Sequence, residues 1–255
     1  MTGRYTYGDS ALAAERLGLV ARMFESTTRA FLRSVVRDPP RVVVDLGCGP
    51  GHTTRLLHEV TGAERTVGLE RSEAFVADAL RDRPPGVSFG LHDVTTVPFP
   101  AGPADLVYAR LLLAHLPDVE GVVGRWSTTL AIGGHLLVDD LEELEAPEPA
   151  FRGYLDDVAI AVVVAQGGEL FVGPRLHAMP DPDGCERVHD AVASFSPPST
   201  LTARVFRMNL AVLEERGETP PRPDLAASLD ELGSGARGGE PATWCVRQIA
   251  WRRMG

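Results

Sequence analysis

The stretch VVVDLGCGPGHTT, from Val42 to Thr54, decides how this chain folds. Its opening run of β-branched residues is typical of a short buried strand. The glycines that follow, Gly47, Gly49 and Gly51, allow a sharp turn and let another molecule come close to the main chain. The threonines and leucines after them begin a helix. Strand, glycine loop and helix in this order form the place where an α/β sheet binds a nucleotide-like ligand.

Strands and helices are expected to alternate around this loop. Apolar residues recur at helical spacing from Ser10 to about Val36, and Asp38-Pro39-Pro40 ends that helix. Beyond the loop, short apolar runs predict strands at 66–69, 87–91, 104–109 and 135–138, with helical patterns between them. This alternation favours parallel strands joined by right-handed crossovers.

The pattern changes after Asp140. An acidic segment, 142–148, leads to a strongly apolar helix at 151–165. A strand at 186–195, a helix at 201–216, a flexible loop at 233–240 and a strand at 243–251 complete the chain. One compact domain with a helical cap explains this order more simply than two separate domains.

Composition limits the class of partner. The 255 residues are 44% hydrophobic and 24% charged, as in a globular protein. A net charge of −10 argues against nucleic acid as the main partner, because phosphate binding needs a basic surface. The three cysteines lie far apart, which favours neither a disulfide framework nor a metal site. With no signal peptide and no apolar run long enough for a bilayer, we expect a cytoplasmic protein without a membrane partner.

The residues around the loop distinguish among nucleotide ligands. A P-loop needs Gly-Lys-Ser or Gly-Lys-Thr, but Gly51-His52-Thr53 stands there and the chain has no lysine. A dinucleotide fold needs G-x-G-x-x-G, whereas this loop is G-x-G-x-G with Asp45 two residues before it. An acid beside the loop would repel a pyrophosphate and suits a cation or an amine.

The segment Asp45–Gly51, DLGCGPG, resembles the first motif of class I S-adenosylmethionine-dependent methyltransferases. Other segments fall where that family has its motifs. These are Glu70, 25 residues after Asp45, His92-Asp93-Val94, Ala104–Val107, Leu116-Pro117-Asp118 and Gly133–Leu137. The resemblance implies an α/β fold, Rossmann-like and doubly wound, with a mostly parallel seven-stranded sheet and a helical cap.

The resemblance also implies a set of cofactor-binding residues. In it Glu70 receives the ribose hydroxyls, since a carboxylate has paired acceptor oxygens, and Asp93 accepts from the adenine amine. For Arg110, a salt bridge to a nearby acid is an equal alternative to a cofactor contact. A Tyr-x-x-Gly leader resembles a lid in a bacterial subgroup. The full set for S-adenosylmethionine is Tyr5, Tyr7, Asp45, Gly47, Cys48, Gly49, Gly51, Glu70, Arg71, Asp93, Val94 and Arg110.

The acceptor is less well defined by the sequence. His115, after the fourth strand, is a candidate general base, with helix packing as the alternative. Asp139, Glu142 and Tyr154 are candidate substrate contacts. We expect methyl transfer to an oxygen or nitrogen of a small molecule, in bacterial secondary metabolism. A cofactor-binding protein without transferase activity is the alternative, and a homodimer is left open.

The same resemblance divides the chain into four segments. The predicted boundaries are an N-terminal helical lid at 1–38, an S-adenosylmethionine-binding core at 39–140, a helical cap at 141–185, and C-terminal strands at 186–255 that complete the core sheet.

Overall fold

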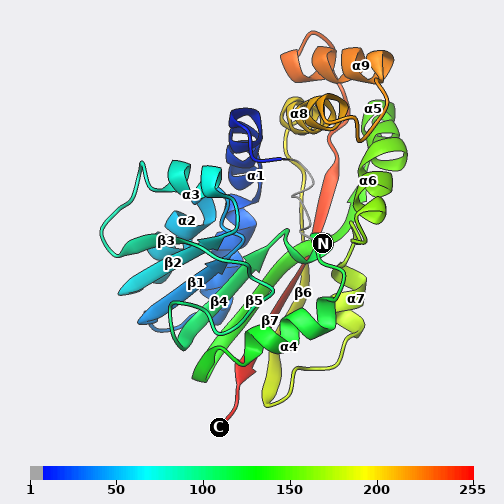
Figure 1. Ribbon diagram of the computed structural model, residues 1–255. Coiled ribbons are helices and arrows are strands. Elements are labelled where there is room, and N and C mark those ends of the chain that lie inside the picture. Colours follow the sequence, from blue (N-terminus) through cyan, green and yellow to red (C-terminus); the bar gives the residue numbers. More distant parts are fainter. Residues whose placement is uncertain (1–7) are drawn as a thin grey trace.

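A seven-stranded sheet lies at the centre of the computed structural model, which describes residues 8–255 (Figure 1). The strand order is β3-β2-β1-β4-β5-β7-β6. Strands β1 to β5 pair in parallel, whereas β7 is antiparallel to both β5 and β6. The mostly parallel, doubly wound α/β fold expected from the sequence is therefore confirmed. The strand bounds are β1 Val42–Leu46, β2 Arg65–Glu70, β3 Val87–Leu91, β4 Ala104–Arg110, β5 Leu130–Glu145, β6 Cys185–Phe195 and β7 Thr243–Arg253.

The sheet has a topological switch point at β1. Strands β2 and β3 lie on one side of it, and β4 and β5 lie on the other. Connections that leave β1 and β4 therefore diverge beyond the carboxyl ends of the strands, where ligands of such folds bind. The glycine loop follows β1 at this point.

Helices cover both faces of the sheet. Because side chains alternate across a strand, Leu137 of β5 packs with Phe31 of the first helix, whereas Leu136 and Val138 pack with Trp126 on the opposite face. Each face thereby has its own hydrophobic cluster. The helices of this layer are α1 Ala11–Val35, α2 His52–Thr61, α3 Glu73–Ala79, α4 Val119–Ser127 and α7 Gly173–Ala178, with a 3₁₀ turn η1 at Leu113–His115.

A third hydrophobic cluster joins the cap to the first half of α1. The cap helices gather beyond one end of the sheet, beside α1 (Figure 1). Phe24 of α1 packs there with Phe151, Phe206 and Trp244 from three other elements. The cap consists of α5 Pro149–Tyr154, a π-helical segment η2 Leu155–Ala159, α6 Ile160–Ala165, α8 Ser199–Glu215 and α9 Pro223–Ser234.

Some elements differ from their prediction. The apolar helix at 151–165 contains the π-helical segment, and β5 continues through Glu145 into the acidic segment because β7 pairs with it. Helix α9 was not predicted, although Leu225, Leu229 and Leu232 have helical spacing and are buried against the cap cluster. The short α7 was also not predicted. No helix within residues 8–255 is both long and apolar enough to cross a membrane.

Candidate functional site

The glycine loop is tied tightly to its neighbours. The Cys48 N–H donates to the carbonyl of Leu69 (3.1 Å), and the Gly51 N–H donates to the carbonyl of Cys48 (3.0 Å). Gly51 has φ +84°, and a Cβ there would lie 2.6 Å from the Phe89 ring. Only glycine fits this position, because both the backbone conformation and the close packing exclude a side chain.

Asp45 lies beneath the loop instead of in the cavity wall. Its Oδ2 accepts a hydrogen bond of 2.7 Å from the Thr54 hydroxyl, which joins β1 to the first turn of α2. The side chain is fully buried, and burial raises its pKa to about 7. The sequence placed Asp45 among the cofactor contacts, but its position inside β1 turns the carboxylate toward α2. Its contacts assign it a supporting role under the loop.

Cys48 lines the cavity with its thiol buried. Burial, reinforced by the nearby Asp45 and Glu70, raises the pKa of this thiol well above its ordinary value. A protonated, buried thiol is a poor nucleophile. The burial of Cys48 therefore fits a packing role within the loop.

Glu70 closes the loop from the end of β2. Its Oε2 accepts from the Gly49 N–H (3.0 Å), and its Oε1 accepts from the N–H groups of Arg71 (2.8 Å) and Ser72 (2.9 Å). A carboxylate has about four acceptor positions, so these three bonds leave about one, on Oε2. Glu70 and Arg71 both line the cavity.

The segment after β3 forms the next part of the wall. Asp93 lines the cavity, and its Oδ1 accepts from the N–H (2.9 Å) and hydroxyl (2.7 Å) of Thr95. Partial burial opposes ionisation, but the two Thr95 hydrogen bonds outweigh it, so the pKa of Asp93 is lowered. The carbonyl of Val94 accepts from Trp126 Nε1 (2.7 Å), which fixes this segment to α4.

Arg110 lies at the end of β4 and lines the same cavity. It donates to the hydroxyls of Thr28 (3.2 Å) and Thr53 (2.7 Å), and its guanidinium lies 5.7 Å from the centre of the Phe24 ring. Within residues 8–255 no carboxylate lies within 4.0 Å of this guanidinium, so the salt bridge considered from the sequence is not formed there. Burial raises the pKa values of Asp45 and Asp139, and the positive charge of Arg110 offsets part of that rise.

One cavity joins these strand ends to the cap. Its first part, called here the cofactor side, lies at the carboxyl ends of β1, β2 and β3 and comprises Gly47, Gly49, Glu70, Arg71, Asp93 and Val94. Its second part, called here the acceptor side, is formed by the cap and α1 and comprises Phe24, Leu144, Tyr154, Leu155, Phe206 and Trp244.

The acceptor side is rich in aromatic rings. Tyr154 stacks on Phe206 with ring centres 4.2 Å apart, and Trp244 lies 5.9 Å from Phe206 and 5.7 Å from Phe24. Tyr154, a substrate candidate from the sequence, is therefore in the cavity wall. The polar residues of the acceptor side include Arg16, whose Nη1 donates to Asn209 Oδ1 at 3.1 Å. Both side chains are buried.

His115 also lines the cavity. Burial lowers its pKa to about 4, and the positive charges of Arg16 and Arg71 act in the same direction. The imidazole is therefore neutral at pH 7. A group with so low a pKa is a weak general base near neutrality, because catalytic efficiency is best when the pKa is close to the working pH.

Neighbouring acids in the second half of β5 point to different parts of the structure. Asp139 faces α1, where its Oδ2 accepts from the hydroxyls of Tyr108 (3.0 Å) and Thr28 (3.3 Å). Asp140 lines the cavity, and its Oδ2 accepts from the N–H groups of Leu112 (3.2 Å) and Leu113 (3.1 Å) at the start of the 3₁₀ turn. Asp139, predicted as a substrate contact, is thus directed away from the cavity by the alternation of β5.

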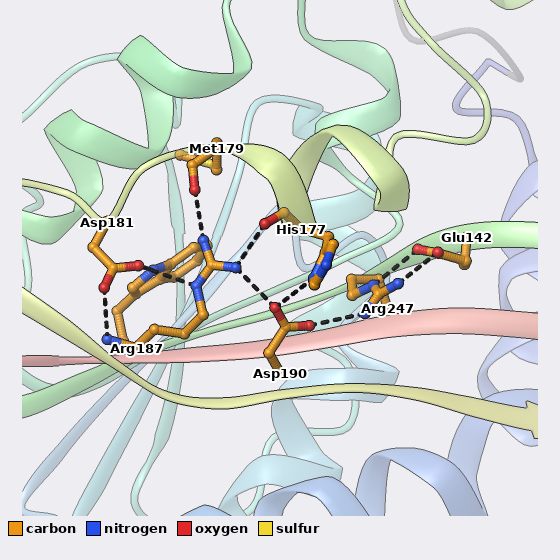
Figure 2. Close-up of polar contacts among 8 residues, drawn as sticks. Glu142, His177, Met179, Asp181, Arg187, Asp190 and Arg247 are labelled. Atoms are coloured by element: carbon orange, nitrogen blue, oxygen red, sulfur yellow. Dashed lines mark hydrogen bonds and ion pairs between the residues drawn. The ribbon is translucent and has the colours of Figure 1, made fainter.

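Glu142 takes part in an ionic network outside the cavity lining. It accepts two hydrogen bonds from Arg247 (2.9 and 2.6 Å), and Arg247 also donates to Asp190 (2.9 Å). Figure 2 shows how the network continues through His177 and Arg187 to Asp181. These contacts join β5, β6 and β7 to α7. Glu142, the second acid predicted to contact substrate, is therefore not among the cavity residues.

Sequence reasoning missed most of the acceptor side. Arg16, Phe206, Asn209 and Trp244 come from α1, α8 and β7, and no short motif unites them. The sequence predicted the helices and the strand that contain them but gave no reason to bring them together. Tyr5 and Tyr7, the predicted lid residues, lie outside the described residues.

Comparison with known proteins fits this geometry. Residues 44–138 match a methyltransferase domain family. A trans-aconitate 2-methyltransferase from Variovorax paradoxus is 42% identical over 41% of this chain and 40% of its own length. A second, from Methylobacterium radiotolerans, is 34% identical over 64% of this chain and 63% of its own. The chain thus spans 40% to 63% of the length of these two curated relatives.

Solved structures support the fold. A methyltransferase structure from Bacillus halodurans aligns with a TM-score of 0.60, at 16% identity, over 90% of this chain and 100% of that one. A type II methyltransferase structure from Anaeromyxobacter dehalogenans aligns with a TM-score of 0.57, at 19% identity, over 89% and 96%. With the loop, Glu70 and Asp93 inside the matched segment, these similarities support a class I S-adenosylmethionine-dependent methyltransferase.

Proposed function

We propose that this protein transfers the methyl group of S-adenosylmethionine to an oxygen or nitrogen atom of a small molecule. One observation carries the proposal. The glycine loop, Glu70 and Asp93 follow three adjacent strands and line one wall of a single cavity. The acceptor side opens from the same cavity, so a donor and an acceptor can meet in it.

The described residues fit the cofactor. Glu70 keeps about one acceptor position for a ribose hydroxyl, one fewer than the two expected from the sequence. Asp93 and the buried Val94 form the adenine end of the wall, and Gly49, with φ +52°, lets the loop backbone approach the ligand. The bound cofactor supplies an activated methyl group on a positively charged sulfur. The protein supplies alignment and a dry site.

The predicted segments suggest a division of roles. We propose that 1–38 acts as a lid, 39–140 holds the cofactor, and 141–185 forms part of the acceptor wall. In 186–255 the strands complete the sheet, while α8 adds Phe206 and Asn209 to that wall. A cytoplasmic location, an acceptor from bacterial secondary metabolism, a homodimer and the lack of a nucleic-acid partner stay predictions.

Trans-aconitate is a second candidate acceptor. The names of the curated relatives favour it. However, the methyltransferase domain match ends at residue 138, before α5, α8 and β7 contribute their cavity residues. The similarity therefore supports the cofactor side more strongly than the acceptor side.

Two measurements test the proposal. Calorimetric titration with S-adenosylmethionine and S-adenosylhomocysteine should show saturable binding of both, whereas NAD should not bind. Mass spectrometry after incubation with S-adenosylmethionine and a panel of phenols, carboxylic acids and amines should show a gain of one methyl group on an acceptor. Binding without any transfer to the panel would favour the alternative, a cofactor-binding protein without transferase activity. Lack of cofactor binding would refute the proposal.

A further inference from the structure

The wall of the acceptor side is mainly apolar. Phe24, Tyr154, Phe206 and Trp244 come from α1, α5, α8 and β7, and each is at least nine-tenths buried. Aromatic rings of this kind bury large apolar areas and prefer to stack on, or meet the edge of, other flat groups. A flat apolar molecule matches such a wall better than a strongly hydrated one.

Arg16 and Trp244 provide hydrogen-bond donors on this side, and the carboxyl of Asp140 also lines the cavity. Arg16 has a guanidinium, which donates and never accepts, and it is already oriented by Asn209. The indole N–H of Trp244 is buried and has no acceptor among residues 8–255. Because an unmet buried donor costs free energy, an oxygen atom of a bound molecule would stabilise the site. The acceptor side is therefore suited to a ligand with oxygen acceptors.

Charge restricts the ligand further. A cationic amine near the buried Arg16 would face a like charge in surroundings of low dielectric constant. Binding of a tricarboxylate would transfer three charged groups from water into the cavity. Burying charges is costly unless each is paired. On this side the wall offers Arg16 as a charged donor, with His115 neutral beside it.

We propose that the acceptor is a flat, mainly apolar oxygen nucleophile that carries at most one anionic group, such as a phenol or an aromatic monocarboxylic acid. Its ring lies against Tyr154, Phe206 and Trp244, and its anionic group, where present, pairs with Arg16. This inference rests on the proposed methyl transfer and names the substrate class of that site. It separates this chain from relatives named for a tricarboxylate.

The test uses the full chain loaded with S-adenosylhomocysteine and four probes measured by calorimetry. Salicylate and 2-naphthol represent the proposed class, benzylamine represents a cation, and trans-aconitate represents a tricarboxylate. We expect each aromatic oxygen probe to bind at least tenfold more tightly than benzylamine or trans-aconitate. Tighter binding of either of the latter, or no binding of salicylate and 2-naphthol, would overturn the inference.

A substitution tests the role of Arg16. Arg16→Gln should weaken salicylate binding at least tenfold and 2-naphthol binding less than threefold, because the naphthol has no carboxylate. Arg22→Gln, at an exposed position of the same helix, is the matched control and should change neither. Equal weakening of both probes by Arg16→Gln would mean that Arg16 only supports the packing, which would refute the pairing. Failure of S-adenosylhomocysteine itself to bind would instead refute the proposed function.

Discussion

The two sides of the cavity are built in different ways. The cofactor side is polar and comes from short segments at the carboxyl ends of adjacent strands, where backbone N–H groups hold Glu70 and Asp93. The acceptor side is apolar and comes from helices and a strand that are far apart in the sequence. If the proposed function holds, the sheet fixes where the methyl donor binds, and the cap with α1 determines which acceptor fits.

The largest effect is expected where the loop is tightest. Gly51→Ala should lower the free energy of unfolding by about 2–4 kcal/mol. The alanine would have to keep the left-handed backbone conformation of Gly51, and its Cβ would clash with the Phe89 ring. Gly102→Ala is the matched control, because Gly102 has φ +77° but no atom within 4 Å of the position that a Cβ would take. Urea unfolding of both variants separates the conformational cost from the clash. Equal losses would show that packing under the loop is loose.

The ionic network at β5, β6 and β7 belongs to neither side and should affect stability alone. Arg247→Met removes hydrogen bonds to Glu142 and Asp190 and should cost about 1.5–3 kcal/mol, the range for bonds to charged groups. Urea unfolding measures the loss. Affinity for S-adenosylhomocysteine should stay within twofold of wild type. A large loss of that affinity would show that the ionic network affects the cavity.

The same network should respond to acid. Burial opposes ionisation of Asp190, but hydrogen bonds from His177, Arg187 and Arg247 outweigh it and lower its pKa. The folded state therefore holds the ionised form, and this stabilisation is present above pH 3.8 and is lost as pH falls further. Urea unfolding from pH 6 to pH 3 should show a smaller loss for Asp190→Asn than for wild type. Parallel curves would contradict the assignment.

The pH dependence of stability that comes from Asp45 should have the opposite sign to that from Asp190. Its pKa is raised from 3.8 to about 7 by burial, so the folded state binds more protons than the unfolded state between these values. Stability therefore falls as pH rises from about 4 to about 7 and then levels off. Relative to wild type, Asp45→Asn should gain up to about 1.4 kcal/mol per pH unit between pH 5 and pH 7. A constant difference in the free energy of unfolding between Asp45→Asn and wild type across this range, measured with urea, would contradict the raised pKa of Asp45.

The smallest effect tests the acceptor side. Trp244→Phe keeps a ring in the wall but removes the buried indole N–H. Loss of one hydrogen bond of about 0.5–1.5 kcal/mol should weaken salicylate binding roughly two- to tenfold. Affinity for S-adenosylhomocysteine should not change. Calorimetry gives both values, and unchanged salicylate binding would place the oxygen of the ligand elsewhere.

The residues that the sequence grouped at the strand ends lie together in the cavity wall, because each is close in sequence to the end of a strand. Loop, Glu70 and Asp93 each follow a strand directly, and parallel strands bring their ends together. Asp45 and Asp139 were predicted to contact a ligand but do not line the cavity. Because side chains alternate along a strand, the carboxylate of Asp45 faces Thr54 and that of Asp139 faces Tyr108. Phe206 and Trp244 meet only through tertiary packing, for which the sequence carries no short signal.

The most direct test titrates S-adenosylhomocysteine into wild type, Glu70→Ala and Phe206→Leu. Glu70→Ala removes a charge-assisted hydrogen bond of about 1.5–3 kcal/mol, so its affinity should fall about 10- to 100-fold. Glu64→Ala, an exposed acid just before the other end of β2, is the matched control. Phe206→Leu should change the affinity less than twofold, because Phe206 lies on the acceptor side. Unchanged affinity in Glu70→Ala, or an equal loss in Phe206→Leu, would contradict the division of the cavity.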